Sequence, residues 1–334
     1  MQVLLVTQSL DHRGLDAIAA AIARRGAQPV RLDTDRFPTH LRIRHRQGPG
    51  SSPITLEDHG VRTVLDQVEA VYYRRLNPAR LLPPDLDPQL RAPSVQESRL
   101  ALLGLMGDLP CFHLDPWAAV RRCDNKALQL RLALGLGLRV PATLTTNDPD
   151  AVREFAASCP GGVVTKMQAS FGVHRADGKI DVVYTNAVSD EDLAALDGLD
   201  LCPMVFQERL PKAVELRVTV IGDQLFTIAV DSSTTATGKV DWRRANNTEG
   251  TVWAPWSLDP VVADQVRALG VQLGLNYGGV DIIVTPAGEH VLLEWNPAGE
   301  FGWVMPHFGD ALPEAFADLL TGRAPRRSPV APSP

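Results

Sequence analysis

The sequence is poor in cysteine, and the few cysteines it has form no recognisable pattern. The four residues include no C-x-x-C pair, and no histidine lies at the spacing of a metal site. This absence argues against a zinc motif and against a disulfide framework. We therefore expect ordinary reduced thiols.

Long apolar runs and an excess of positive charge are also missing. No apolar stretch approaches the roughly 18 to 20 residues of a membrane-spanning helix, and Met1 to Leu5 lacks the basic region that opens a secretory signal. The formal net charge is -6, which gives no overall field that would attract nucleic acid or an anionic membrane. We expect a cytoplasmic protein with no nucleic-acid or membrane partner, in which local cations bind any anionic substrate.

The sequence does contain enough apolar residues for two or three packed units, since 45% of its 334 residues are hydrophobic. Its opening predicts a β-α-β unit with a small parallel sheet, because apolar runs at 2–7 and 29–32 flank a helical pattern at 15–25. We place this first domain at 1–115. It also contains expected strands at 41–44 and 70–73 and an expected helix at 98–109.

The remaining sequence predicts two further units and a tail. A small α+β unit is expected at 116–205, and a larger, mainly antiparallel unit is expected at 206–322. The tail at 323–334, rich in proline, serine and arginine, is expected to be disordered. The expected helices are 117–136, 148–157 and 260–273, and the expected strands are 140–145, 163–167, 204–208, 215–221, 224–230, 280–285 and 290–295.

The strongest chemical signal lies in the last two predicted strands. Glu294 and Asn296 are two residues apart and therefore project to one face, and Asp281 interrupts the apolar strand before them. Hard oxygen donors on neighbouring strands are what Mg²⁺ needs when it also binds phosphate oxygens. In the alternative interpretation Asp281 caps a strand and Asn296-Pro297 only forms a turn. Glu294 favours the metal site, because a carboxylate inside an apolar strand is costly unless it is paired or metal-bound.

Two lysines form a second signal. Lys126 follows an Asp-Asn pair, and Lys166 ends an apolar strand before a loop of small residues that includes Ser170 and Gly172. Such a loop can direct backbone N–H groups at phosphate, although a lysine leaving an apolar strand more often faces solvent. The sequence has neither the G-x-x-x-x-G-K-[ST] nor the G-x-G-x-x-G pattern, so a P-loop and a dinucleotide fold are excluded.

The third signal is the polar segment that begins at Gln207. A strand that leaves its sheet at Glu208, Arg209 and Leu210 exposes backbone groups that can pair with adenine. Glu215 could accept hydrogen bonds from ribose hydroxyls, and Arg217 could bind phosphate with both arms of its guanidinium. For Lys212 in the same segment, a solvent-facing charge is an equally good interpretation.

The order of these motifs over residues 115–310 resembles the ATP-grasp superfamily. The shared features are N-K, V-x-K, Q-E-x-L-x-K, E-L-R-V and the D…E-x-N set. Five further segments are similar to a narrower group, the microviridin-type peptide ligases or graspetide synthetases. These are V-T-Q-S at 6–9, V-R-L-D-T-D-R-F-P at 30–38, Y-Y-R-R at 72–75, D-W-R at 241–243 and N-P-A-G at 296–299.

The resemblance implies a fold, a reaction and partners. The fold would be ATP-grasp, of mixed α/β and α+β class, with an N-terminal parallel-sheet domain, a small central α+β domain and a C-terminal antiparallel-sheet domain. Members use ATP and Mg²⁺ to form ω-ester or ω-amide crosslinks between side chains of a ribosomally made precursor peptide. The implied partner is a peptide with a leader and a core of acidic and hydroxyl residues, and the implied assembly is a homodimer.

The resemblance also implies roles for individual residues. Lys126 and Lys166, with Ser170 and Gly172, would hold ATP phosphates, and Arg217 would lie near the transferred phosphate. Arg243 would bind the carboxylate to be activated, although a solvated arginine in a basic loop is an equally good interpretation. A hairpin at 172–186 would dock the leader. Gln207, Glu208, Arg209, Leu210 and Glu215 would hold adenine and ribose, and Asp281, Glu294 and Asn296 would hold Mg²⁺.

Two other functions use the same motifs. The first is an ATP-grasp ligase that joins small amino acids or adds glutamate to a protein tail, and only its acceptor region would differ. The second is a nucleotide-binding scaffold without turnover, against which the complete set of Asp281, Glu294 and Asn296 argues, because a non-catalytic descendant need not keep all three.

Overall fold

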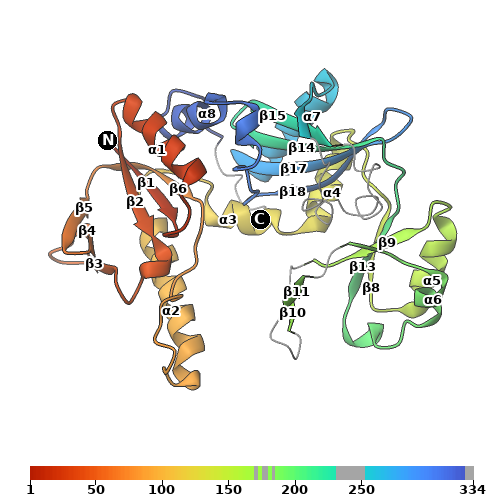
Figure 1. Ribbon diagram of the computed structural model, residues 1–334, viewed down its shortest axis with the longest axis horizontal. Coiled ribbons are helices and arrows are strands. Elements are labelled where there is room, and N and C mark those ends of the chain that lie inside the picture. Colours follow the sequence, from red (N-terminus) through yellow and green to blue (C-terminus); the bar gives the residue numbers. More distant parts are fainter. Residues whose placement is uncertain (169–171, 175–179, 183–184, 231–252, 328–334) are drawn as a thin grey trace.

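The protein is built from sheets that follow one another along its length (Figure 1). The computed structural model describes residues 1–168, 172–174, 180–182, 185–230 and 253–327. The N-terminal parallel sheet lies at one end, the large antiparallel sheet lies in the middle, and a smaller antiparallel sheet lies at the other end. This arrangement confirms the expected fold class.

The N-terminal sheet is parallel throughout, in the order β2-β1-β6-β7. Its strands are β1 (Gln2–Thr7), β2 (Gln28–Asp33), β6 (Val68–Tyr73) and β7 (Phe112–Leu114). Every residue of β1 is buried, and alternate side chains enter two different cores. Val3 and Leu5 pack toward α1 (Arg13–Arg24) and α8 (Ala311–Leu320), whereas Leu4 and Val6 pack on the opposite face.

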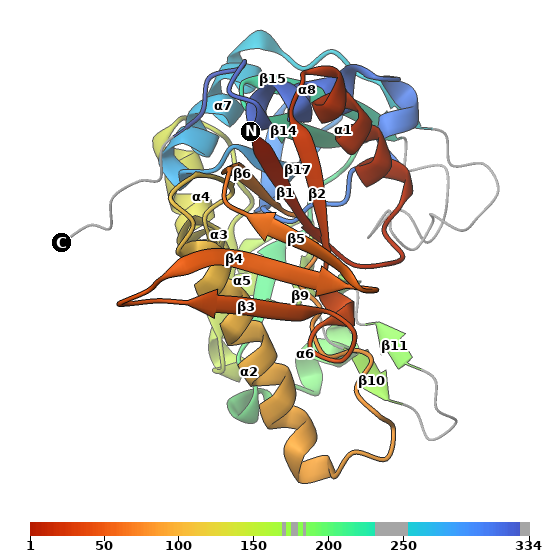
Figure 2. The ribbon, with the colours of Figure 1, turned by 90° about the vertical axis from the view of Figure 1, so that its left-hand side faces the viewer.

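A three-stranded meander and a long helix cover that opposite face (Figure 2). The meander consists of β3 (Arg42–Arg46), β4 (Ser52–Asp58) and β5 (Val61–Leu65), and the helix is α2 (Pro88–Gly107). We expected this helix to begin only at 98. It begins ten residues earlier because the Asp87 side chain accepts from the Gln89 N–H, and Pro88 fits the first helical turn.

The C-terminal sheet is antiparallel, in the order β16-β15-β14-β17-β18. Its strands are β14 (Val214–Ile221), β15 (Gln224–Val230), β16 (Trp253–Pro255), β17 (Tyr277–Val284) and β18 (His290–Asn296). One face packs against α3 (Trp117–Cys123), α4 (Lys126–Gly135) and α7 (Pro260–Leu273). We had assigned the first two of these helices to the central domain. Their apolar side chains instead complete the core of this sheet.

The central sheet has the order β12-β9-β13-β8. Its strands are β8 (Thr143–Thr146), β9 (Val163–Lys166), β12 (Asn186–Ala187) and β13 (Met204–Glu208), and its helices are α5 (Pro149–Ser158) and α6 (Asp190–Ala194). We expected the domain boundary at 205, which lies inside β13. Because β13 pairs with β8 and β9, the boundary belongs after Glu208.

The expected hairpin at 172–186 is present in part. The strands β10 (Gly172–His174) and β11 (Ile180–Val182) pair antiparallel and project from the central sheet (Figure 1). Asn186 already belongs to β12, which pairs back onto β9. Residues 175–179, between these two strands, lie outside the described residues.

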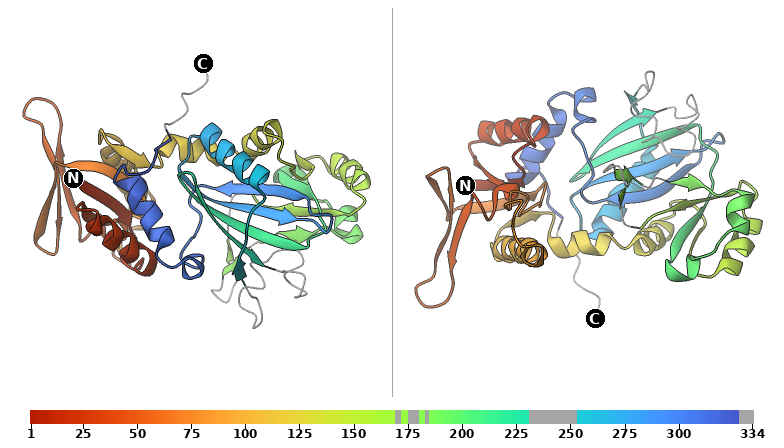
Figure 3. Two further views of the ribbon diagram at one scale, coloured as in Figure 1. Left: turned by 90° about the horizontal axis from the view of Figure 1, so that it is seen from above. Right: turned by 60° about the horizontal axis from the view of Figure 1, so that its bottom comes forward.

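The C-terminal part of the chain returns to the N-terminal sheet, where α8 lies beside α1 (Figure 3). We expected disorder from residue 323 onward. Arg327 instead donates its backbone N–H to Asn276 Oδ1 at 2.7 Å and its guanidinium to Leu275 O at 2.9 Å. The expected tail therefore began too early, and residues 328–334 lie outside the described residues. Within the described residues, the short 3-10 helices are Thr34–Arg36, Leu199–Leu201 and Met305–His307.

No helix within the described residues combines the length and the apolar character that crossing a membrane requires.

Candidate active site

A row of charged side chains crosses three strands of the C-terminal sheet. Arg217 on β14 lies opposite Asp281 on β17, which lies opposite Glu294 on β18. Arg217 Nη1 donates to Asp281 Oδ1 at 2.8 Å. Their chain neighbours Val218, Val280 and Trp295 point into the core beneath the helices, so the charged row occupies the face away from those helices.

A β-bulge places an apolar cluster beside this row. Asp281 pairs with Glu294, whereas Ile282 pairs with Leu292, so Leu293 is an extra residue in β18. Leu293 packs against Leu210, Ile283 and Val291, and not into the helical core that receives Leu292 and Trp295. Apolar and acidic side chains thus adjoin on one face, which suits a ligand with an aromatic base and a charged end.

Lys126 reaches the row from the first turn of α4. The Asn125 side chain caps that helix by accepting from the Leu128 N–H at 3.0 Å. Lys126 Nζ lies 2.9 Å from Glu294 Oε2. The structure therefore brings this lysine to the carboxylate that we expected to bind the metal.

The donor set fits a magnesium ion. Asn296 is two residues beyond Glu294 and lies opposite Gly279, so Asp281, Glu294 and Asn296 share one face across neighbouring strands. Asn296 Oδ1 also accepts from the Ala298 N–H at 3.1 Å, so the turn that we gave as an alternative is present as well. Two carboxylates and one amide oxygen suit Mg²⁺, which keeps waters and phosphate oxygens as further ligands. Within the described ranges, no cluster of three His, Cys, Asp or Glu side chains offers a closed metal site.

Two glycines make room for the guanidinium of Arg217. A Cβ atom on Gly279 would lie 2.3 Å from Arg217 Cζ, and one on Gly299 would lie 2.8 Å from Arg217 Nη2. The Tyr277 hydroxyl donates to Gly299 O and fixes this loop. Arg217 is only 6% exposed. Burial opposes its charge, but Asp281 outweighs that effect, and the pKa of Arg217 stays above its ordinary value.

The residues expected to hold adenine and ribose divide into two groups. Gln207 donates its side-chain amide to Thr143 Oγ1 at 2.9 Å and is 3% exposed, so its side chain serves the central sheet. Glu208 Oε2 accepts from the Ala142 N–H at 3.3 Å, and the Arg209 N–H donates to Gly162 O at 2.9 Å. Only the apolar side chain of Leu210 joins the cluster beside the charged row.

Glu215 lies on the same face as Arg217, because the two are two residues apart on β14. It is 6% exposed, and its Oε1 atom lies 3.1 Å from Lys212 Nζ. The solvent-facing interpretation of Lys212 is wrong, since only 12% of its side chain is exposed. A buried carboxylate next to a lysine fits the expected ribose contact.

The other expected phosphate contacts come from the central sheet or fall outside the described residues. Lys166 is the last residue of β9 and lies opposite Val205, so it comes from the central sheet, whereas Lys126 comes from α4. Gly172 begins β10. Ser170 and Arg243 lie outside the described residues.

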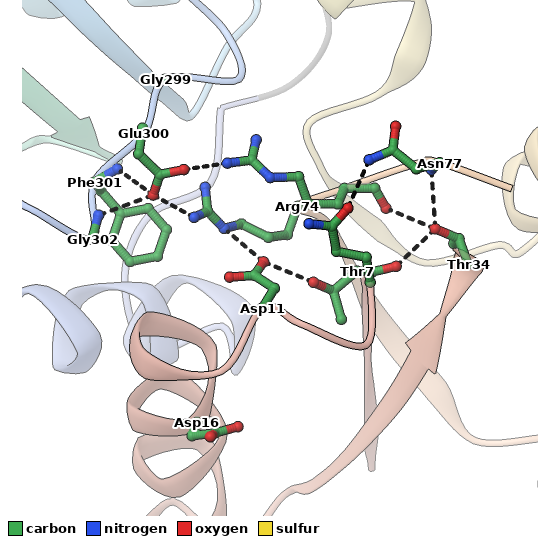
Figure 4. Close-up of polar contacts among 12 residues, drawn as sticks. Thr7, Asp11, Asp16, Thr34, Arg74, Asn77, Gly299, Glu300, Phe301 and Gly302 are labelled. Carbon is green, nitrogen blue, oxygen red and sulfur yellow. Dashed lines mark hydrogen bonds and ion pairs between the residues drawn. The ribbon is translucent and has the colours of Figure 1, made fainter. Parts of the chain in front are cut away.

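A second charged cluster joins the N-terminal sheet to the loop that follows Asn296 (Figure 4). Arg74 donates to Asp11 Oδ2 at 3.2 Å and to Glu300, and Arg75 also donates to Glu300. The Arg74 guanidinium lies 4.5 Å from the ring centre of Phe301. Sequence reasoning quoted the Y-Y-R-R segment but assigned it no role, because its partner lies more than 200 positions away.

The charges of this cluster are strongly coupled. Burial opposes the charge of Arg74, yet Tyr72 and Glu300 raise its pKa above its ordinary value. Burial also opposes the charge of Glu300, but Arg74 outweighs that effect and lowers the pKa of Glu300. The cluster therefore stabilises the fold when Glu300 is ionised.

We expect Glu300→Gln to lower the free energy of unfolding by about 1 to 3 kcal/mol, the usual loss for a hydrogen bond to a charged group. Because the pKa of Glu300 is lowered on folding, this contribution is present above its unfolded pKa and disappears as the pH falls through the folded pKa. Urea unfolding at neutral and acidic pH measures it. The exposed Glu154→Gln is the control, and equal stability of the two variants would contradict the role of Glu300.

Comparisons with known proteins agree with this geometry. Residues 2–121 match the family described as the MvdD pre-ATP grasp domain. The macrocyclase MdnC from Microcystis aeruginosa MRC, solved with precursor peptide MdnA, is 39% identical with a TM-score of 0.87, over 96% of this chain and 100% of that chain. No curated protein matches this chain.

Two further solved structures are similar over their whole length. A ligase from Chryseobacterium gregarium, described as a RiPP-associated ATP-grasp ligase in complex with ADP and a leader and core peptide, is 31% identical with a TM-score of 0.93, over 98% of each chain. The macrocyclase MdnB from Microcystis aeruginosa MRC is 36% identical with a TM-score of 0.77, over 95% of this chain and 98% of that chain.

Proposed function

Because this chain belongs to the ATP-grasp ligases that modify ribosomally made precursor peptides, we propose that it is a macrocyclase that joins two side chains of one such peptide. The observation that carries the proposal is the row of Arg217, Asp281 and Glu294, completed by Lys126. These side chains provide both the anionic ligands for a metal and the cations for phosphate.

Different residues of the site would bind the metal, the phosphates, the base and the ribose of Mg-ATP. Asp281, Glu294 and Asn296 would hold Mg²⁺, which neutralises charge on the phosphates when it is bound. Lys126 and Lys166 would hold phosphate oxygens, together with Ser170 and Gly172, which follow Lys166 in the sequence. The apolar cluster of Leu210, Ile283, Val291 and Leu293 would receive the base. Glu215 would bind the ribose, and the backbone of residues 208–210 would contact the base.

The reaction would activate a carboxylate and then transfer it. A carboxylate oxygen of the peptide attacks the γ-phosphorus of ATP, ADP leaves, and an acyl phosphate forms. Arg217 would donate to the transferring phosphoryl group and offset its charge. A Thr or Ser hydroxyl, or a Lys amine, then attacks the acyl carbon, phosphate leaves with the bonding electrons, and the nucleophile loses its proton. An ω-ester or ω-amide ring results, because both groups belong to one bound peptide.

The partner would contact the protein in two places. The hairpin of β10 and β11 projects from the central sheet and offers a platform for the leader, whereas the acidic core residue must reach the charged row. The structure of the Chryseobacterium ligase contains both a leader and a core peptide, which supports a two-part substrate. The expected homodimer stays a prediction, which analytical ultracentrifugation would test.

The decisive experiment uses the precursor peptide that an adjacent short reading frame would encode, with repeated Thr and Glu or Asp clusters. Incubation of the full-length protein with this peptide and Mg-ATP should remove one water per crosslink, which mass spectrometry detects. Fragmentation would locate an ester or an amide. ATP-dependent joining of free amino acids, with the peptide unchanged, would support the alternative ligase and contradict our proposal.

We expect Arg243→Ala to lower the rate of peptide dehydration by about 10- to 100-fold. Arg243 belongs to the D-W-R segment, and the loss of a charge-assisted contact to a partly desolvated carboxylate typically costs roughly 1.5 to 3 kcal/mol. Nucleotide affinity should not change. Arg244→Ala removes a neighbouring charge and is the matched control. Equal dehydration rates for the two variants would exclude Arg243 as the carboxylate contact.

A further inference from the structure

The side chain of Gln129 pairs with the backbone of the strand that carries the metal ligands. Gln129 lies on α4 and is 1% exposed. Its Nε2 atom donates to Trp295 O at 2.8 Å, and its Oε1 atom accepts from the Trp295 N–H at 2.8 Å. The amide thus makes both hydrogen bonds that a neighbouring β-strand would otherwise make.

This pairing occurs where β18 has no strand partner. β18 is the last strand of its sheet, so one of its edges has no further strand beside it. Farther along this strand, the Leu292 N–H donates to Arg139 O at 2.9 Å. Gln129 binds the strand at Trp295, which is the single residue between Glu294 and Asn296. A buried backbone N–H and C=O left without partners would be costly, and Gln129 satisfies both of them.

Gln129 also belongs to the element that carries Lys126. The two residues are three positions apart on α4 and therefore lie on the same side of the helix. Lys126 Nζ contacts Glu294 Oε2 at 2.9 Å, one residue before the backbone that Gln129 binds. Gln129 Nε2 also donates to Cys123 O at the end of α3. One buried amide thus connects α3 and α4 to β18, the strand that carries Glu294 and Asn296.

We propose that Gln129 is a positioning residue, which sets the distance between Lys126 and the ligands Glu294 and Asn296. The proposal rests on the metal and phosphate roles given above. Packing alone does not need an amide here, because Trp295 is already fixed by its buried ring and by its indole N–H, which donates to Tyr277 O at 3.3 Å. The amide adds two directional hydrogen bonds, which fix the position and the orientation of β18 relative to α4.

The test replaces Gln129 by methionine, which has a similar length and no amide. We expect the affinity for Mg-AMPPNP, measured by calorimetry, to fall by about 10-fold, as is usual for the loss of an outer-shell partner of a metal site. Amide hydrogen exchange at Trp295 should become faster. Thr34→Val is the matched control, because it removes the buried bond from Thr34 Oγ1 to Thr7 O in the N-terminal sheet. That variant should lose stability and keep its nucleotide affinity.

A double-mutant cycle with Lys126→Ala separates positioning from stability. If Gln129 acts through Lys126, the loss of affinity from Gln129→Met should shrink when Lys126 is already absent. A loss of stability with unchanged affinity, or fully additive losses, would overturn the proposal. If Gln129→Met does not fold, Gln129→Glu replaces it in the same measurements. This variant retains the acceptor for the Trp295 N–H and loses the donor to Trp295 O. The same changes in affinity and stability would support or overturn the proposal. Wild-type protein that does not bind Mg-AMPPNP would contradict the proposed function, and not the role of Gln129 alone.

Discussion

Replacing Glu294 by glutamine should lower turnover by at least about 100-fold, comparable to the loss of a preorganised group that stabilises transition-state charge. The substitution keeps the shape of the side chain and removes the charge that is proposed to bind Mg²⁺. That charge also lies 2.9 Å from Lys126 Nζ. Nucleotide should still bind, more weakly, because Lys126, Lys166 and the apolar cluster are unchanged. The Glu294→Gln variant should therefore separate binding from chemistry.

The measurement is ADP release in the presence of saturating peptide, together with nucleotide affinity by calorimetry. Glu289→Gln is the matched control, since Glu289 lies just before β18, and 54% of its side chain is exposed. The control should have wild-type rates. Wild-type ADP release by Glu294→Gln would remove the basis for the magnesium site.

Gly279→Ala should lower turnover as much as Arg217→Ala does, by about 100-fold, although it adds only one methyl group. The added Cβ atom would lie 2.3 Å from both Cζ and Nη2 of Arg217. Arg217 would have to leave Asp281, and the donor proposed for the transferring phosphoryl group would lose its position. Stability should fall as well, because the buried guanidinium would lose its ion pair with Asp281.

Single-turnover kinetics of peptide dehydration measures this effect apart from product release. Gly104→Ala is the matched control, because a Cβ atom there would meet nothing within 4 Å, and alanine is the better residue inside a helix. The Gly104→Ala variant should be slightly more stable and should have an unchanged rate of peptide dehydration. A Gly279→Ala variant with wild-type rate would show that Arg217 does not need its present position.

The sequence predicted the regular parts of the fold, because they follow from local periodicity. The apolar run of β1 and the helical pattern of α1 were enough to predict the parallel sheet. The start of α2 was missed because its first turns are mostly exposed and contain Pro88 and Pro93, which interrupt a helical pattern. Assignment of α3 and β13 to the wrong unit has another cause, since periodicity shows that a face is buried but not which sheet covers it.

The candidate site was predictable to the extent that it depends on strand alternation. The shared face of Glu294 and Asn296 follows from their spacing, and the register of β17 and β18 agrees with it. The bulge at Leu293 has no local signal, because leucine fits either face of a strand. The pairing of Arg74 with Glu300 and the space that Gly299 provides for Arg217 join distant parts of the chain. Such contacts arise only from the tertiary fold.

The return of α8 to the N-terminal sheet has a consequence for biosynthesis. The core on the α1 side of that sheet includes Phe301, Phe316 and Leu319, which are translated long after β1. Until those residues leave the ribosome, the apolar face formed by Val3 and Leu5 is covered by α1 but not by α8. The N-terminal domain therefore cannot complete its core while the rest of the chain is being made, and expression of residues 1–121 alone would leave part of that face open to aggregation.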